Sequence, residues 1–455
     1  QGRVANTCFQ DTGWSLTLQD MKWSVDRLGA MGCNLFNFHG FSYTIDGLRK
    51  HHSPPSLFQQ NPYWKHFRLL SDYTGRLCYL LSQGKRVVNI AMLDPVTSLW
   101  SHLAHPHAGW QYAGYDGDEE KLAGRLAEDW AYLSKSLNQI QRDFDTLDPE
   151  TLGDASISGG RLRVGKANYD ILIIPPISNL ERPAFECIRQ FVNSGGKVIC
   201  LGLLPVEDIQ EGASVVEAFS RMTDMEPGRM IRDYIGHELG VHVIQRGNLY
   251  LIRTGGSVVR NRGARALGDL LEQLSPRQVA VDTEKKGISA LLCHHRETEK
   301  ERIVFLTNTT QGSFEARIGL RLPTKYRQVE RWDLETGRRS AVSIEKSGNR
   351  MSVGLVFNRL ESHVLVVSEG KVQKPVVQEA PMPLTLDLKG PWKVDPEEDN
   401  CLRLDRFRMQ IDSHNRGTKQ GWHKPDYKDS RWISTQPKPF VEQIRGLSPL
   451  PNLPF

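Results

Sequence analysis

Several signatures of well-known protein classes are missing from this chain of 455 residues. Its seven cysteines include no C-x-x-C pair, and no set of residues has the spacing of metal ligands. There is no G-x-G-x-x-G between a strand and a helix, no Walker sequence and no G-x-S-x-G elbow. These absences argue against a bound metal ion, a nucleotide cofactor and a serine-hydrolase elbow, and they leave only a structural calcium ion open.

Long hydrophobic runs and blocks of like charge are missing as well. No apolar run reaches the roughly 18 residues that a membrane-spanning helix needs. The net charge of +5 is spread along the chain, which indicates a solvated surface and no nucleic-acid partner. The chain opens with Gln1 and shows no signal peptide, so we expect upstream sequence and cannot judge export. Scattered cysteines weakly favour a reducing compartment such as the cytoplasm.

The composition that is present is that of a globular protein with several domains. Hydrophobic residues make up 39% of the chain and charged residues 24%, both near the averages for globular proteins. A chain of 455 residues is too long for one ordinary domain, so two to four are expected.

The beginning of the chain predicts a β-α-β unit and a further helix. An apolar stretch from Val4 to Phe9 precedes Thr17-Leu-Gln-Asp20, which resembles a helix-capping box. The helix that follows is expected to end at Gly32. Asn34–Phe38 is the next predicted strand, and a second helix is expected from about Tyr63 to Ser82. A unit of this size implies a parallel strand pair.

Two further patterns divide the rest of the chain. From about Arg86 to about Val281, apolar strands alternate with helices, which predicts a doubly wound α/β domain. From about Gly287, short strands at close spacing predict an antiparallel β-sandwich. A proline-bearing linker at Lys374–Pro383 then leads to a last β-rich segment. The elements expected in the α/β domain are Val87–Leu93, Lys121–Phe144, Tyr169–Ile174, Pro183–Asn193 and Lys197–Leu201, and those of the sandwich are Ile303–Leu306, Phe314–Leu322, Val329–Asp333, Ala341–Ile344 and Val364–Val367.

The most suggestive residues follow the second predicted strand. His39 and Tyr43 lie at and just past its carboxyl end, the edge where the loops of parallel β/α folds converge on a site. His39 fits a hydrogen bond to a substrate hydroxyl, and a histidine satisfied by backbone is the equal alternative. Trp14, Tyr43, Tyr63 and Trp64 offer aromatic faces on which the C–H patches of sugars pack, although core packing is the commoner role of a single aromatic. His102, His105 and His107 are expected to be plain loop histidines.

Several motifs together resemble a family of carbohydrate-active enzymes. They are Thr12-Gly-Trp-Ser-Leu-Thr with Asp20-Met-Lys22, Gly32-Cys-Asn34, His39-Gly with Tyr43, Pro54-Pro-Ser56, Asn61-Pro-Tyr-Trp64, Tyr73 with Arg76, and Asp94-Pro95 with Ser98 and Trp100. The set resembles large bacterial hydrolases related to the α-L-rhamnosidases of glycoside hydrolase family 106. The domain order is similar to that of the family 42 β-galactosidases.

The resemblance implies a multidomain C-terminal fragment of such an enzyme. Residues 1–85 would be the C-terminal part of a (β/α)8 catalytic barrel, and 86–282 a glutamine-amidotransferase-like α/β domain. Residues 283–373 would form the β-sandwich, and 384–455 the start of an incomplete jelly-roll domain that resembles sugar-binding modules. The partner would be an oligosaccharide or polysaccharide, no membrane or nucleic acid is expected, and a homo-oligomer stays open.

The resemblance also assigns site residues. Trp14, His39, Tyr43 and Trp64 would bind the sugar. Glycosidases of this kind use two carboxylates, and a glutamate would be expected near Thr7, where the sequence has Asn6-Thr7-Cys8. Asp11 and Asp46 are the nearest acids and are weak catalytic candidates.

Three hypotheses follow from these residues. The first is a fragment of an enzyme that hydrolyses O-glycosidic bonds, with the chain alone expected to be inactive. The second is a non-catalytic carbohydrate-binding or scaffold protein derived from such an enzyme, which the missing glutamate favours. The third, weaker hypothesis is a nucleotide-dependent oxidoreductase or an amidotransferase with Cys200 as nucleophile, although no G-x-C-x-G surrounds that cysteine.

Overall fold

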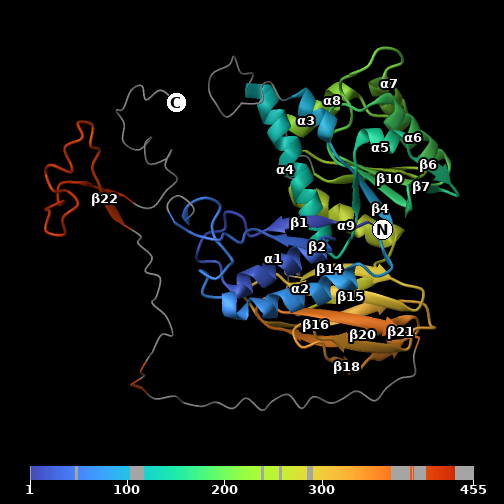
Figure 1. Cartoon of the computed structure of the whole chain (residues 1–455). Coiled ribbons are helices and arrows are strands. Elements are labelled where there is room, and N and C mark those ends of the chain that lie inside the picture. The colour runs from blue at the N-terminus through green and yellow to red at the C-terminus, as the bar shows by residue number, and fades with distance from the viewer. Residues whose placement is uncertain are drawn as a thin grey trace. The chain divides into compact units, whose positions relative to one another are not determined.

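The computed structural model describes residues 2–46, 50–102, 117–236, 240–255, 259–283, 291–369, 390–391, 393 and 406–435 (Figure 1). The chain divides into two compact units, Gln1–Val377 and Gln378–Phe455, and each is considered by itself. Among the described residues no helix is long and apolar enough to span a membrane.

The first unit begins with the predicted β-α-β arrangement. Strands β1 (Ala5–Cys8) and β2 (Leu35–Phe38) pair in parallel and are joined through α1 (Leu18–Ala30). The capping box forms as predicted, because the Thr17 hydroxyl accepts a hydrogen bond from the Asp20 amide at 3.1 Å and the Asp20 carboxylate accepts one from the Thr17 amide. A short 3-10 helix, η2 (Trp64–His66), and α2 (Phe67–Leu81) complete the segment.

Helices α1 and α2 join this segment to the sandwich. Met21 and Val25 of α1 and Leu77 of α2 are fully buried in one hydrophobic core with Phe305 and Val364 from the sandwich. Figure 1 shows the two helices lying between the β1–β2 pair and the sandwich strands. The parallel pair is therefore supported through its helices by a distant part of the chain.

The middle of the first unit is a three-layer α/β structure. Its sheet has the strand order β11-β12-β10-β9-β4-β5, in which all neighbours are parallel except β11 and β12. The strands are β4 (Ile90–Leu93), β5 (Asp145–Leu147), β9 (Ile171–Ile174), β10 (Lys197–Leu201), β11 (His242–Arg246) and β12 (Leu249–Arg253). The helices are α3 (Val96–Ser101), α4 (Gly117–Gln139), α5 (Pro149–Gly153), α6 (Arg182–Asn193), α7 (Val215–Thr223), α8 (Pro227–Gly236) and α9 (Arg262–Leu274), and β6 (Ser156–Ser158), β7 (Arg161–Val164) and β8 (Ala167–Tyr169) form a small separate sheet.

Each face of this sheet has its own hydrophobic core. Leu172 and Ile174 of β9 point to one side, where they pack with α6 and α7, and Ile171 and Ile173 point to the other, where they pack with α4 and α9. Period-two alternation of buried residues on both faces explains why β9 is apolar throughout.

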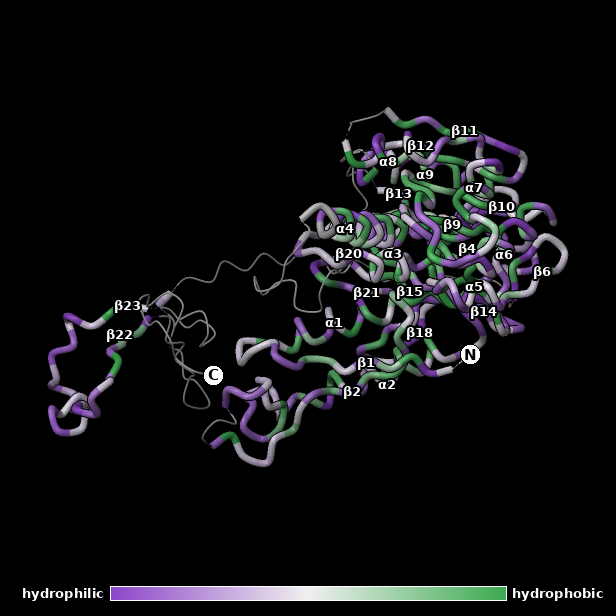
Figure 2. The backbone as a smooth tube through the Cα atoms, turned by 90° about the horizontal axis from the view of Figure 1, so that it is seen from above, coloured by the Kyte–Doolittle hydropathy of each residue, from purple (hydrophilic) through white to green (hydrophobic). Residues whose placement is uncertain are grey.

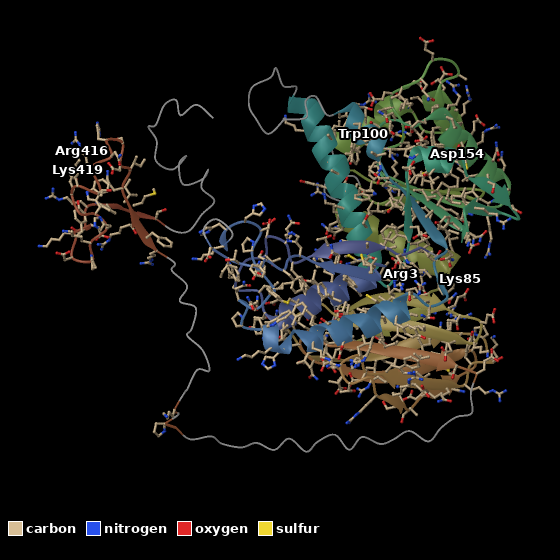
Figure 3. All side chains as sticks on the ribbon, viewed as in Figure 1. Arg3, Lys85, Trp100, Asp154, Arg416 and Lys419 are labelled. Carbon is tan, nitrogen blue, oxygen red and sulfur yellow. The ribbon has the colours of Figure 1, made fainter. Side chains whose placement is uncertain are left out.

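Two antiparallel sheets form the sandwich. One has the order β13-β16-β20-β19, and the other β18-β17-β21-β15-β14-β3, with a shared core that includes Val304, Ile318 and Val353. The strands are β3 (Lys85–Arg86), β13 (Val279–Asp282), β14 (Leu291–Glu297), β15 (Glu301–Asn308), β16 (Phe314–Arg321), β17 (Gln328–Trp332), β18 (Arg339–Ala341), β19 (Glu345–Ser347), β20 (Arg350–Phe357) and β21 (Ser362–Ser368). Lys85 lies where the sandwich meets the α/β layer (Figure 3).

Some expected elements differ from the observed ones. The strand expected at 87–93 is shorter and begins at Ile90, because the chain just before it pairs with β14 of the sandwich through β3, and only β4 enters the parallel sheet. The helix expected at 121–144 ends at Gln139, and residues 145–147 form β5. Strands β14 and β20 were not predicted.

In the second unit, the described residues form the antiparallel pair β22 (Phe407–Met409) and β23 (Ile433–Thr435). The rings of Trp422, Tyr427 and Trp432 pack together, with centroids 5.2–6.3 Å apart. The linker at 374–383 and the strands expected at 384–388 and 402–404 lie outside the described residues.

Candidate functional site

The carboxyl ends of β1 and β2 carry the predicted site. The His39 amide donates to the Cys8 carbonyl at 2.9 Å, which aligns the two strand ends. The Leu57 amide donates to the Gly40 carbonyl at 2.8 Å, and the Gly13 amide donates to the Pro54 carbonyl at 3.1 Å. These backbone bonds bring three loop segments together, and we call the residues 9–14, 39–46 and 54–64 the loop cluster. It projects beyond the layered part of the unit in both views (Figures 1 and 2).

Side chains of the loop cluster fix its conformation. The Ser56 hydroxyl accepts a hydrogen bond from the Ser42 amide at 3.2 Å, and the Asn61 side chain donates to the Ser56 carbonyl at 3.0 Å. The Gln60 side chain donates to the Tyr43 carbonyl at 2.9 Å. Ser56 and Asn61 therefore hold the loops in place, which explains their part in the sequence motifs.

Aromatic rings form the floor of the loop cluster. The Trp64 ring lies 5.0 Å from Phe58, 6.3 Å from Phe41 and 6.2 Å from Phe67, measured between centroids. Phe41 remains 47% exposed and Trp64 39% exposed, so the cluster presents aromatic faces to solvent. Phe41 and Phe58 were not singled out from the sequence, because only the loop closure brings them to Trp64.

The four predicted sugar-binding residues lie on this edge in different environments. Trp14 donates its ring N–H to the Lys50 carbonyl at 2.9 Å and keeps part of its ring exposed. His39 is half-buried, and its Nδ1 atom is buried without a hydrogen-bond partner among the described residues. Tyr43 is 87% exposed, so the described residues do not enclose it in a pocket.

The acidic candidates are all at the surface. Asp11 has a φ of 56° in the turn after β1, and both Asp11 and Asp46 are exposed. In β1, Thr7 pairs with Asn37 and the Cys8 thiol lies 3.3 Å from the Asn6 side-chain oxygen. Burial, followed by the neighbouring Cys33, raises the pKa of the Cys8 thiol to about 11, so this thiol stays neutral near pH 7. Strand β1 thus contributes no charged group to the edge.

Other reactive side chains are structural. Cys200 lies inside β10, and burial raises the pKa of its thiol, so it lacks the exposed strand-end position of a nucleophile. The amidotransferase hypothesis thus loses the nucleophile named for it. His102 is buried with its Nε2 atom 2.8 Å from the Ser178 hydroxyl, and His105 and His107 lie outside the described residues. The described residues contain no group of three or more side chains placed to hold a metal ion.

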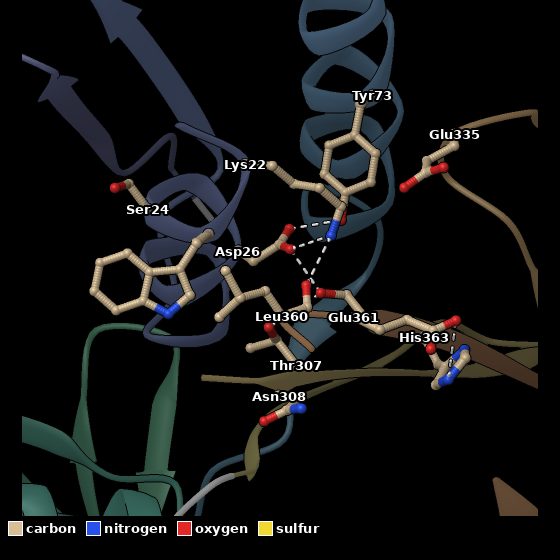
Figure 4. Close-up of polar contacts among 12 residues, drawn as sticks. Lys22, Ser24, Asp26, Tyr73, Thr307, Asn308, Glu335, Leu360, Glu361 and His363 are labelled. Atoms are coloured by element: carbon tan, nitrogen blue, oxygen red, sulfur yellow. Dashed lines mark hydrogen bonds and ion pairs between the residues drawn. The ribbon is translucent and has the colours of Figure 1, made fainter. Parts of the chain in front are cut away.

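A buried polar network anchors the helices beneath the loop cluster (Figure 4). The fully buried Asp26 carboxylate accepts hydrogen bonds from Lys22 at 2.8 Å, from the Tyr73 hydroxyl at 2.6 Å and from the Ser362 hydroxyl at 2.6 Å. Burial, followed by the Asp26 charge, raises the pKa of Tyr73 well above its ordinary value. The network ties α1 and α2 to β21, and nothing in the sequence motifs identified Asp26.

The side chain of Arg76 makes a further contact between α2 and the sandwich. It donates to the Leu334 carbonyl at 2.8 Å and to the Glu335 carbonyl at 2.9 Å. Arg76 therefore joins α2 to the sandwich.

Comparison with known proteins shows which proteins this chain resembles. No family model matches the chain. A curated protein from Formosa agariphila, named "Putative beta-glucuronidase", is 20% identical over 380 residues, which cover 82% of this chain and 27% of that protein. The solved structure of a rhamnosidase from Novosphingobium sp. PP1Y has a TM-score of 0.54 at 17% identity, and the match covers 85% of this chain and 32% of that one.

A family 42 β-galactosidase from G. stearothermophilus gives a TM-score of 0.49 at 13% identity, and the match covers 77% of this chain and 51% of that one. The chain thus spans about a third or less of the length of the glucuronidase-named protein and of the rhamnosidase. The rhamnosidase match shows a shared fold, and the resemblance to glycoside hydrolases predicted from the motifs is confirmed at that level.

Proposed function

We propose that this chain is part of a carbohydrate-active enzyme that hydrolyses O-glycosidic bonds, in which residues 1–85 form the C-terminal part of a (β/α)8 barrel. The observation that carries the proposal is the parallel β1–β2 pair, with helices on one side and the aromatic loop cluster at its carboxyl end. Chemistry in such barrels takes place at that end of the strands. The similarity to a rhamnosidase fold and to a glucuronidase-named protein supports a glycan as substrate.

The other regions support this core in the proposal. The parallel strands of the α/β region have the order 2-1-3-4-5 when they are numbered along the chain, which is a doubly wound order and supports the amidotransferase-like assignment of 86–282. Cys200 gives it no nucleophile, so we assign this domain a structural or oligomer-forming role. The sandwich at 283–373 braces the helices α1 and α2, and 384–455 begins a jelly-roll sugar-binding-like domain.

In this proposal Trp14, His39, Tyr43 and Trp64 bind the sugar. The test is calorimetric titration of the longest natural form of the protein with oligosaccharides that it binds. His39→Ala and Trp64→Ala should each weaken binding by about 1–3 kcal/mol, because a hydrogen bond or a ring contact is lost. Trp100→Ala is the matched control, since Trp100 is 71% exposed on α3, away from the loop cluster (Figure 3). Unchanged affinity in both site variants would exclude the loop cluster as the sugar site.

A non-catalytic carbohydrate-binding or scaffold protein is the second candidate. The observation that favours it is the absence of a carboxylate from β1, where Asn6, Thr7 and Cys8 stand, together with the exposure of Asp11 and Asp46. A panel of aryl glycosides separates the two functions. We expect no turnover from the 455-residue chain, and turnover from the longest natural form only if that form is an enzyme. Clear turnover by the 455-residue chain would mean that it contains both carboxylates.

A further inference from the structure

We infer that a groove between α2 and the β17–β18 hairpin is a second carbohydrate-binding site, separate from the loop cluster. The inference rests on the proposed function, since it takes a glycan to be what the protein meets. The cavity measures about 520 Å³, within the range of sites that hold small ligands. Its walls include Asp72, Gly75, Arg76 and Tyr79 from α2 and Trp332 and Arg339 from the hairpin.

A glycine of α2 leaves space for the groove. Gly75 lies in the interior of α2, where glycine lowers helix stability relative to alanine. A Cβ atom added there would meet no other atom within 4 Å, so packing does not require the glycine. Any larger side chain at this position would extend into the open space that the groove occupies. The glycine therefore makes room for a ligand at the expense of the helix.

The walls offer the two kinds of contact that sugars use. Tyr79 is 63% exposed, so its ring presents apolar surface to the groove. Exposed aromatic faces pack against the C–H groups of sugar rings. Trp332 is half-buried, and the Arg339 guanidinium covers one face of its ring, 3.7 Å from the centroid, so this pair offers the groove a hydrogen-bond donor.

The polar groups of the groove balance in charge. Asp72 and Asp333 contribute two negative charges, and Arg76 and Arg339 contribute two positive ones. Arg76 is fixed by its two bonds to the backbone carbonyls of Leu334 and Glu335. A lining whose charges cancel suits a neutral sugar better than a uronic acid or a sulfated sugar. The structure therefore assigns a neutral oligosaccharide to the groove.

The groove extends along α2 away from the loop cluster. Phe67, at the start of α2, contacts Trp64, and the groove residues run from Ser71 to Leu80 of the same helix. At a rise of about 1.5 Å per residue, Ser71 lies about 6 Å and Tyr79 about 18 Å along the helix from Phe67. A glycan chain held in the groove would keep the polymer close to the protein and raise its effective concentration at the loop cluster.

Affinity electrophoresis of the 455-residue chain tests this site. Native gels would contain galactomannan, xyloglucan or arabinogalactan as neutral polymers, and polygalacturonate as the charged polymer. At least one neutral polymer should retard the protein more strongly than polygalacturonate does. Tyr79→Ala should weaken the retardation about tenfold in apparent affinity, as expected for a lost ring contact. Gly75→Gln should abolish it, because glutamine favours the helix and fills the groove.

Leu69→Ala is the matched control, because Leu69 is an exposed apolar residue of α2 outside the groove. It should migrate as the unsubstituted chain does, and circular dichroism should show that all variants are folded. No retardation by any neutral polymer would overturn the inference, and so would equal retardation of the three variants. If only Trp64→Ala removes the retardation, the polymer binds at the loop cluster. The inference about the groove would then be wrong, while the proposed function would be supported.

Discussion

The two parallel sheets of the first unit differ in how completely they are covered. In the α/β sheet, every residue of the central strands β4 and β9 is buried, and hydrophobic cores lie on both faces. In the β1–β2 pair only Cys8 is fully buried, and Leu35 is 44% exposed. Parallel sheets occur where both faces are covered. The α/β sheet is thus complete in itself, whereas the β1–β2 pair depends on groups outside it.

The sandwich supplies part of that cover, through α1 and α2. Its contribution includes both the shared hydrophobic core and the Asp26 network. If this support is what holds the β1–β2 pair, changes in the sandwich contact should loosen the pair and leave the α/β sheet intact.

The largest effect is expected for Asp26→Ala. The substitution leaves the Lys22 ammonium and the buried hydroxyls of Tyr73 and Ser362 without their shared acceptor. We expect the stability of the α1–α2 contact to fall by about 3–5 kcal/mol, because removing one member of a buried ion pair leaves the other charge without a partner. Hydrogen exchange of the α1 and α2 amides would measure it, with the strands β9 and β10 as an internal reference.

Asp72→Ala is the control for this change, because Asp72 is an exposed carboxylate on α2 that lies 3.5 Å from Arg68. It should alter stability by no more than about 0.5 kcal/mol. A loss below about 1 kcal/mol for Asp26→Ala would show that the shared core alone holds the helices.

A smaller effect is expected from pH. His295 lies buried in β14, where burial and then the charge of Arg302 lower its pKa from 6.5 to about 3. The unfolded chain therefore binds a proton below pH 6.5 that the folded chain does not bind. Above pH 6.5, His295 does not lower the free energy of unfolding. As the pH decreases from 6.5 to 3, the free energy of unfolding falls by about 1.4 kcal/mol per pH unit.

Urea unfolding of the sandwich between pH 7 and pH 4.5 would detect this dependence. His295→Gln should reduce its slope by about 1.4 kcal/mol per pH unit, because glutamine takes up no proton. The remaining dependence would come from His294 and His363, whose pKa values burial also lowers. His242→Gln should leave the slope unchanged, since His242 is exposed on β11. An equal pH dependence in all three proteins would show that His295 is protonated freely in the folded state. In that case the sandwich, which supports the β1–β2 pair, would not be the acid-sensitive part of the first unit.

The same contrast explains what the sequence could predict. Strands β9 and β10 were predicted because burial on both faces gives uninterrupted apolar runs. Strand β20 was missed although Met351, Val353 and Phe357 alternate inward, since Ser352 and Gly354 interrupt the apolar run. Strand β14 was missed because its run of two histidines and an arginine looks exposed, and only the packed neighbours bury it.

The site was predictable to a similar degree. The position of His39 at a strand end follows from the local pattern, and the structure places it there. The contact of Trp64 with Phe41 and Phe58 depends on loop closure and has no local signal. Asp26 lies four residues after Lys22, a spacing typical of an exposed helical pair, while its partner Ser362 is 336 residues away.

The smallest effect is expected for Leu35→Ala, and it tests the comparison most directly. In the 455-residue chain Leu35 of β2 is 44% exposed, so its truncation should change stability by at most about 0.5 kcal/mol. In the longest natural form, the barrel strands and helices of our proposal would cover that face, and the same change should cost about 2–5 kcal/mol. Leu81→Ala, at a fully buried position of α2, should cost a similar amount in both forms and serves as the control. An equally small effect of Leu35→Ala in both forms would mean that the face of β2 stays open to solvent, and that the β1–β2 pair is not part of a closed barrel.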